Sequence, residues 1–135
     1  MKDWLDVVRE ITSSDRQRDY GHPLLNFLRI SLHWNIEDVG RMRRGIYDTP
    51  LQVAKKMYTL KISRDDNQFK EDNHIDVMGY GRAVGRMHAL MIGLGYSDGI
   101  RALAVMNHSM MFLLLEDLVE MDAERMVELE QEGMK

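Results

Sequence analysis

Five polar residues at helical spacing are the first candidates for chemistry in this sequence. Lys61 and Arg64 end one apolar-periodic segment, and Asp72, Asp76 and Tyr80 stand four apart at the start of the next. Residues three or four apart share one face of a helix, so each group forms a line. Carboxylates bind hard cations, and basic side chains pair with phosphate. The set therefore indicates a site for a metal ion and a phosphate.

Each member of this set also has a structural explanation. The helix dipole favours acids in the first turn of a helix and bases in the last turn. Lys61 and Arg64 could equally pair with the aspartates. Asp76 lies one turn inside its helix, where the dipole effect weakens, so it is the stronger of the two candidates for binding Mg²⁺.

The segment DRQRDYGHP, residues 15–23, is richer in charged and aromatic side chains than a connection between helices needs. Loops of this kind often carry function, and Arg16 and Tyr20 are its candidates. The alternative is a solvated loop with a turn at Tyr20-Gly21. The five histidines are too scattered to predict a zinc site.

Apolar periodicity and breaker residues predict about five helices. We expect an all-α antiparallel bundle in a single domain, 1–135, completed by oligomerisation. The expected helices cover about 2–11, Pro23 to before Gly45, Pro50 (capped by Thr49) to about Arg64, about 75–91, and one long helix at about 97–131.

Two further patterns carry expectations for packing and for metal binding. Gly79, Gly81 and Gly85 interrupt the fourth helix, which predicts that another helix or a ligand approaches its backbone closely, with helix packing as the favoured explanation. The acidic run 116–130 is typical of a solvated face, although Asp117 and Glu120 have the spacing of a carboxylate pair that could complete a metal site.

Composition excludes several classes of function. The formal net charge is −4, so double-stranded DNA is not an expected partner. The chain has no cysteine, which excludes disulfides and thiolate chemistry. Its longest apolar run is too short to span a bilayer, so we expect a soluble protein without a membrane partner. The lack of cysteine is compatible with the reducing cytoplasm, which is the expected compartment.

Three stretches resemble a family of small bacteriophage proteins, which is similar in turn to the MazG-like, all-α nucleoside triphosphate pyrophosphatases. They are DRQRDYGHPLLNFLRISLHW, VAKKMYTLKISR and DNHIDVMGYGRA, within residues 11–86. The resemblance implies a helical dimer or tetramer in the host cytoplasm. It also implies Mg²⁺-dependent hydrolysis of a nucleoside triphosphate to monophosphate and pyrophosphate.

The resemblance assigns roles to particular residues. Asp72 and Asp76 would hold Mg²⁺, and with Lys61 they would be the catalytic residues. The substrate-binding set would be Arg16, Tyr20, Asn26, Trp34, Lys61, Arg64 and Tyr80, with Tyr20 or Trp34 stacking on a base.

The sequence also departs from the superfamily pattern. The E-x-x-E pair is missing where Met57 and Lys61 stand, and Leu25 replaces a common acid of the phage family. Glu37, Asp38, Asp117 or Glu120 would have to supply further ligands. A non-catalytic protein that captures a linear or cyclic nucleotide in the same pocket is therefore the alternative, and a helical interaction protein with structural ion pairs is the third possibility.

Overall fold

The computed structural model describes residues 3, 5–7, 21–67 and 71–135, with side chains described for 3, 5–7, 21–63 and 75–135. Within these ranges the chain is helical and has no strand, which confirms the all-α class. The helices are α3 (Pro23–Glu37), α4 (Val39–Arg43), α5 (Pro50–Asn67), α6 (Glu71–Gly93), α7 (Gly99–Ala104), α8 (His108–Glu120) and α9 (Ala123–Gly133).

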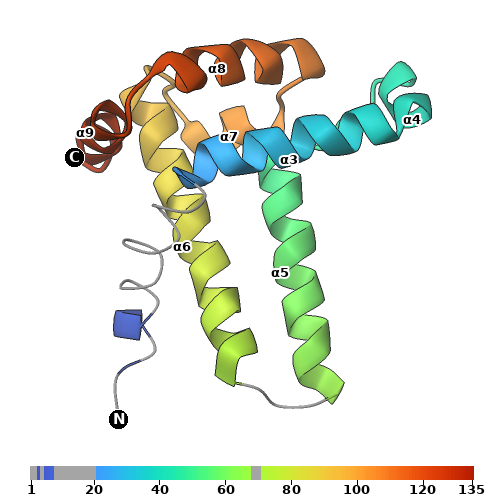
Figure 1. Cartoon of the computed structure of the whole chain (residues 1–135), viewed down its shortest axis with the longest axis vertical. Coiled ribbons are helices and arrows are strands. Elements are labelled where there is room, and N and C mark those ends of the chain that lie inside the picture. Colours follow the sequence, from blue (N-terminus) through green and yellow to red (C-terminus); the bar gives the residue numbers. More distant parts are fainter. Residues whose placement is uncertain (1–2, 4, 8–20, 68–70) are drawn as a thin grey trace.

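Helices α5 and α6 form the central pair of the molecule. They run side by side in opposite directions, and α3 crosses one end of the pair (Figure 1). Helix α8 lies along α3, and α9 packs against α6. Helices α3, α4, α8 and α9 form an upper layer across this end of the pair (Figure 1). The far ends of α5 and α6, toward residues 67 and 71, extend away from the upper layer.

The predicted helix at 97–131 is wrong, because the structure divides this region into α7, α8 and α9. Two short polar side chains cause the divisions. The Asn107 carboxamide accepts the Met110 backbone N–H at 2.9 Å, and the Asp122 carboxylate accepts the Arg125 N–H at 2.8 Å. Such caps satisfy the free N–H groups of a new helix, which therefore starts in a new direction.

Smaller differences affect the predicted boundaries. The single helix expected from Pro23 to Gly45 is split at Asp38, whose carboxylate caps α4 by accepting the Arg41 N–H at 3.2 Å. The Thr49 cap is confirmed, since its hydroxyl oxygen accepts the Gln52 N–H at 3.2 Å. Helix α5 continues to Asn67, beyond the predicted end. The helix expected at 2–11 lies mostly outside the described residues.

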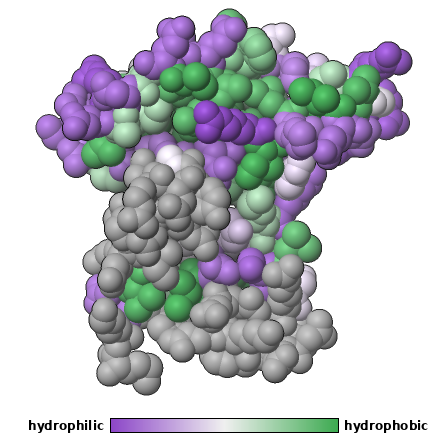
Figure 2. All heavy atoms as spheres, viewed as in Figure 1, coloured by the Kyte–Doolittle hydropathy of each residue, from purple (hydrophilic) through white to green (hydrophobic). Residues whose placement is uncertain are grey.

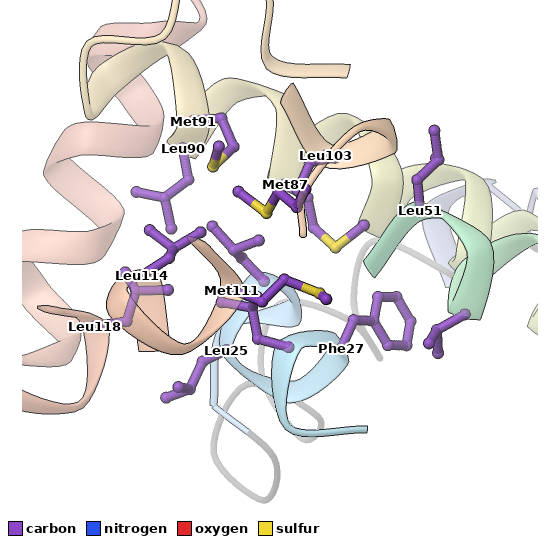
Figure 3. Close-up of a cluster of buried hydrophobic side chains, with 14 of the residues drawn as sticks. Leu25, Phe27, Leu51, Met87, Leu90, Met91, Leu103, Met111, Leu114 and Leu118 are labelled. Carbon is purple, nitrogen blue, oxygen red and sulfur yellow. The ribbon is translucent and has the colours of Figure 1, made fainter. Parts of the chain in front are cut away.

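The core forms where α3, α6 and α8 meet, and the fully buried Leu103 of α7 lies within it beside Met87 (Figure 3). Leu24 and Leu28 of α3 are fully buried. Methionines fill much of the remaining space, as expected from their flexible side chains, and the buried ones are Met87, Met91, Met106, Met111 and Met126. Leu25 belongs to this core, so the position holds an apolar packing residue.

Close helix approach occurs at glycines other than the predicted ones. A Cβ at Gly93 would overlap the Leu129 carbonyl oxygen, and a Cβ at Gly133 would overlap that of Ala89. Helices α6 and α9 therefore touch backbone to backbone. By contrast, a Cβ at Gly81 or Gly85 would meet no described atom within 4 Å, so the expected packing at these two positions is absent from the described part of the chain.

Hydrophilic side chains cover both ends of the upper layer, and apolar ones reach the surface between them (Figure 2). The exposed apolar residues of α8 include Phe112, Leu113 and Val119. A second copy of the chain could cover them, so homo-oligomerisation stays a prediction. None of the described helices combines the length and the apolar character needed to cross a membrane.

Candidate functional site

Lys61 and Asp76 join the two central helices. The Lys61 Nζ lies 3.0 Å from the Asp76 Oδ2, and each side chain is about a fifth exposed, at 23% and 22%. The sequence predicted a cation beside this aspartate, and the structure supplies a lysine from the neighbouring helix. A charge pair at this depth is reachable from solvent and is only partly screened by it.

The other members of the charged constellation are placed less completely. Arg64 lies in α5 and Asp72 in α6, one turn before Asp76, but their side chains lie outside the described residues. Arg16 and Tyr20 lie outside the described residues altogether. The prediction that these four residues meet Lys61 and Asp76 is therefore neither confirmed nor contradicted.

Tyr80 follows Asp76 on the same line of α6 and is half-buried. Its ring stacks on Phe27 of α3, with the ring centroids 6.3 Å apart and an interplanar angle of 30°. Asn26, beside Phe27, is also half-buried. The aromatic contact holds α3 against α6, and its geometry lies in the range where ring pairs add stability. Tyr80 thus has a packing role near the Lys61–Asp76 pair.

Trp34 does not lie with Lys61. It lines a groove of about 530 Å³ between α3 and α5, together with Gln52, Lys55, Lys56, Thr59 and Leu60. Lys56 and Lys61 are five residues apart, which places them about 140° apart around the helix. The groove and the Lys61–Asp76 pair therefore occupy different sides of α5. The structure separates predicted substrate residues that the sequence had grouped in one pocket.

The acids proposed as extra metal ligands are also distant from Asp76. Asp117 and Glu120 are exposed on α8, which lies at the other end of the α5–α6 pair from residue 71 (Figure 1). Glu37 and Asp38 are exposed at the break between α3 and α4. Among the described residues, no group of three histidines or acids is placed to hold a metal ion. These four acids do not complete a site around Asp76.

A buried charged cluster was missed by the sequence analysis. The Glu130 Oε1 lies 2.6 Å from the His22 Nε2 and accepts the Arg86 Nε–H at 2.8 Å, and all three residues are buried. Glu130 had been assigned to a solvated acidic face, which is wrong for this residue. In α9, Glu130 follows Met126 by four residues and Leu129 by one, so it lies beside the apolar stripe of the helix. This spacing was the signal in the sequence that Glu130 is buried.

The cluster shifts the pKa values of both titratable members. Burial lowers the pKa of His22 below its ordinary value, although the hydrogen bond to Glu130 acts the other way. Burial would raise the pKa of Glu130, but the hydrogen bond from His22 and the charge of Arg86 outweigh it and lower this pKa overall. The cluster therefore holds a neutral histidine beside an ion pair.

The fold and these contacts define an all-α protein whose central helices are joined by a partly exposed ion pair. Residues 3–88 match the family described as "Domain of unknown function (DUF6378)", and the chain belongs to this family. It is also similar to the Gene 55 protein of Mycobacterium phage L5, with 34% identity over 84 residues. The match covers 62% of this chain and 51% of that protein, so the chain spans about half the length of its relative. No solved structure matches.

The family region contains α3, α5 and most of α6, and thus both Lys61 and Asp76. It ends before α7, α8 and α9. The buried cluster therefore links a residue of the C-terminal part, Glu130, to two residues of the family region, His22 and Arg86.

Proposed function

We propose that this protein binds a nucleoside triphosphate with Mg²⁺ between α5 and α6 and hydrolyses it to the monophosphate and pyrophosphate. The observation that supports this proposal is the partly exposed Lys61–Asp76 pair, 3.0 Å apart. An ammonium group pairs with phosphate oxygens, and a carboxylate binds a hard cation. When a Mg²⁺-nucleotide binds, Lys61 would therefore pair with phosphate oxygens and Asp76 with Mg²⁺. The ion pair would be broken, but each charge would have a new partner.

The donor set suits Mg²⁺. Proteins hold this ion through one or two carboxylates, water molecules and the phosphates of a substrate, without a closed protein cage. Asp76 supplies one carboxylate, and Asp72 precedes it by one helical turn. Bound Mg²⁺ would neutralise charge that develops on the phosphoryl oxygens during hydrolysis.

The chain's own residues would position the substrate. Lys61 would bind phosphate oxygens from the α5 side of the site. Tyr80 is fixed by its contact with Phe27 and would border the site one turn beyond Asp76. The resemblance of these helices to MazG-like pyrophosphatases supports the same reaction. A base-stacking role for Trp34 is not part of this proposal, because Trp34 faces a different side of α5.

Capture of a nucleotide without hydrolysis is the second candidate, and the same ion pair favours it. Lys61 stands where the enzyme superfamily has an acid, and it already neutralises Asp76. A phosphate group could bind Lys61 with no metal ion. The ligand would then be a linear or a cyclic nucleotide, and binding would not require Mg²⁺.

Turnover of purified protein separates the two candidates. The protein would be incubated with each common ribo- and deoxyribonucleoside triphosphate and Mg²⁺ or Mn²⁺, and the products separated by ion-exchange chromatography. We expect one substrate to yield pyrophosphate. Asp76→Asn should reduce the rate roughly a hundredfold or more, the scale on which a charge-stabilising group acts. Glu128→Gln, an exposed acid in α9, is the matched control and should leave the rate unchanged.

Calorimetry with the same nucleotides and with cyclic dinucleotides, with and without Mg²⁺, completes the test. Heat that is independent of metal, absent in Lys61→Gln and not accompanied by turnover would establish capture. Neither heat nor turnover would reject both candidates and leave a helical interaction protein with structural ion pairs.

A further inference from the structure

The groove between α3 and α5 is open to solvent and is lined by basic, polar and apolar side chains. Its volume of about 530 Å³ lies within the range of ligand pockets, roughly 300 to 1,000 Å³. Two lysines, Lys55 and Lys56, line it beside the half-buried ring of Trp34. Its lining contains no acidic residue. The groove therefore presents positive charge next to apolar surface.

The Lys56 ammonium group is held in a fixed place. Its Nζ lies 2.6 Å from the Asp48 Oδ1 and 5.2 Å from the centroid of the Trp34 ring. An ammonium group has three donors, so donors remain for a ligand after the bond to Asp48. The side chain is 46% exposed, which leaves those donors accessible.

Asp48 is itself rigidly placed. Its backbone N–H donates to the Asn35 Oδ1 at 2.6 Å, and its carbonyl oxygen accepts the Asn35 Nδ2–H at 3.1 Å. Its second carboxylate oxygen accepts from Arg41 at 3.3 Å. A cation positioned by such contacts loses little conformational freedom when a ligand binds.

The charge of this region favours an anion. Arg41 and Lys56 both pair with the buried carboxylate of Asp48, and Lys55 adds a further positive charge to the groove lining. Lys55 is exposed on the same rim. Both lysines line the groove, and an ammonium group forms strong hydrogen bonds with phosphate oxygens.

The rest of the lining suits a flat, partly polar group. Leu60 is 60% exposed and offers apolar surface beside Trp34. Gln52 supplies an amide that donates and accepts, and Thr59 supplies a hydroxyl oxygen that can accept a hydrogen bond. The Thr59 hydroxyl donates to the Lys55 carbonyl oxygen at 2.9 Å, so it is oriented.

We infer that this groove is a second binding site, separate from the Lys61–Asp76 pair, for a nucleoside monophosphate. Lys55 and Lys56 bind the phosphate, and the base lies against Leu60 beside Trp34. Trp34 positions Lys56 and does not stack face to face with the base, because the ammonium group covers its ring. Binding here requires neither Mg²⁺ nor hydrolysis at the α5–α6 site.

Fluorescence of Trp34 tests the inference directly. The chain has two tryptophans, so the Trp4→Phe protein reports on Trp34 alone. This protein would be titrated without metal with guanosine and adenosine monophosphates, and with guanosine and inorganic phosphate as the separate halves. We expect a saturable change with a monophosphate, and binding at least about tenfold weaker for either half, since each lacks contacts that the whole ligand makes.

Lysine variants locate the ligand. Lys55→Gln should raise the Kd for the monophosphate about tenfold or more, as expected for loss of a charged hydrogen bond. Lys56→Gln should do the same, with circular dichroism to verify its fold. Arg29→Gln removes an exposed charge of α3 outside the groove lining and should leave this Kd unchanged. Lys61→Gln tests whether the monophosphate binds at the α5–α6 site instead.

Several results would overturn the assignment. An unchanged Kd for the monophosphate in Lys55→Gln would do so, and so would a Kd raised only by Lys61→Gln. Inorganic phosphate that binds as tightly as the monophosphate would also overturn it. So would the absence of both a fluorescence change and heat with either monophosphate. Failure here would not affect the proposed hydrolysis, which is measured through Asp76→Asn turnover. Loss of turnover would likewise leave binding in the groove intact.

Discussion

His22 and Glu130 are 108 positions apart in the chain, yet the His22 Nε2 lies 2.6 Å from the Glu130 Oε1. The His22 Nδ1 accepts the Leu24 backbone N–H at 3.1 Å, so the proton of the neutral ring is on Nε2 and is donated to Glu130. Arg86 donates to the same carboxylate oxygen at 2.8 Å. One buried carboxylate thus ties the start of α3 to α6 and α9.

Acidification should destabilise the protein through this cluster. The pKa of His22 is lowered from its ordinary value of 6.5, so the folded state binds fewer protons than the unfolded state below that pH. The stabilisation is complete above pH 6.5 and decreases as the pH falls toward the folded-state pKa. Glu130, with a pKa below its ordinary 4.5, adds a loss at still lower pH. Thermal unfolding between pH 7.5 and 5 measures the first effect.

His22→Asn isolates the histidine contribution to that pH dependence. Asparagine can still accept the Leu24 N–H as an N-cap but cannot titrate. We expect its Tm to be lower than that of the natural protein at neutral pH and to fall less between pH 7.5 and 5. Equal slopes for the two proteins would contradict the neutral, buried state of His22.

Removing the charge of Glu130 should be strongly destabilising. Glu130→Gln leaves the buried Arg86 without this carboxylate, and breaking a buried ion pair costs about 3 to 5 kcal/mol. Glu128→Gln removes the partner of Arg125 on the exposed side of the same helix and should cost less than about 1 kcal/mol. Urea denaturation of both variants measures the difference. Similar losses would mean that the cluster is not desolvated as its burial indicates.

The sequence predicted helices correctly where a capping residue or an apolar period of about 3.6 residues marks them. Pro23, Thr49 and the apolar spacing of α5 and α6 indicated helices that the structure contains. The C-terminal division was missed because Asn107 and Asp122 end and restart helices only if their side chains turn back to the backbone. A continuous helix satisfied the apolar pattern equally well.

The candidate site was only partly predictable, for a different reason. Lys61 and Asp76 could be paired from sequence because adjacent antiparallel helices bring their joined ends together. Trp34 could not be assigned to a side of α5, since that depends on how α3 crosses the pair. The contact between His22 and Glu130 depends on the packing of α9, which no local pattern specifies.

The Lys61–Asp76 pair should contribute little to stability, which makes its variants suitable for functional tests. Both side chains are about a fifth exposed, so solvent partly screens their attraction, and the loss of freedom on ordering two side chains opposes it. A double-mutant cycle with Lys61→Met and Asp76→Asn should give a coupling energy of about 1 kcal/mol or less. A coupling of several kcal/mol would instead identify the pair as a structural element and weaken its proposed role in binding nucleotides.

Glycine substitutions should have opposite effects at two positions of α6. Gly93→Ala places a Cβ against the Leu129 carbonyl oxygen, so α9 must move away from α6. Such overpacking costs about 1 to 3 kcal/mol. At Gly85 a Cβ would meet no described atom within 4 Å, and alanine favours the helix by up to about 1 kcal/mol. Thermal unfolding should therefore show a lower Tm for Gly93→Ala and an equal or higher Tm for Gly85→Ala. A lower Tm for Gly85→Ala would indicate that another surface, such as a second copy of the chain, approaches α6 there, as the sequence pattern first predicted.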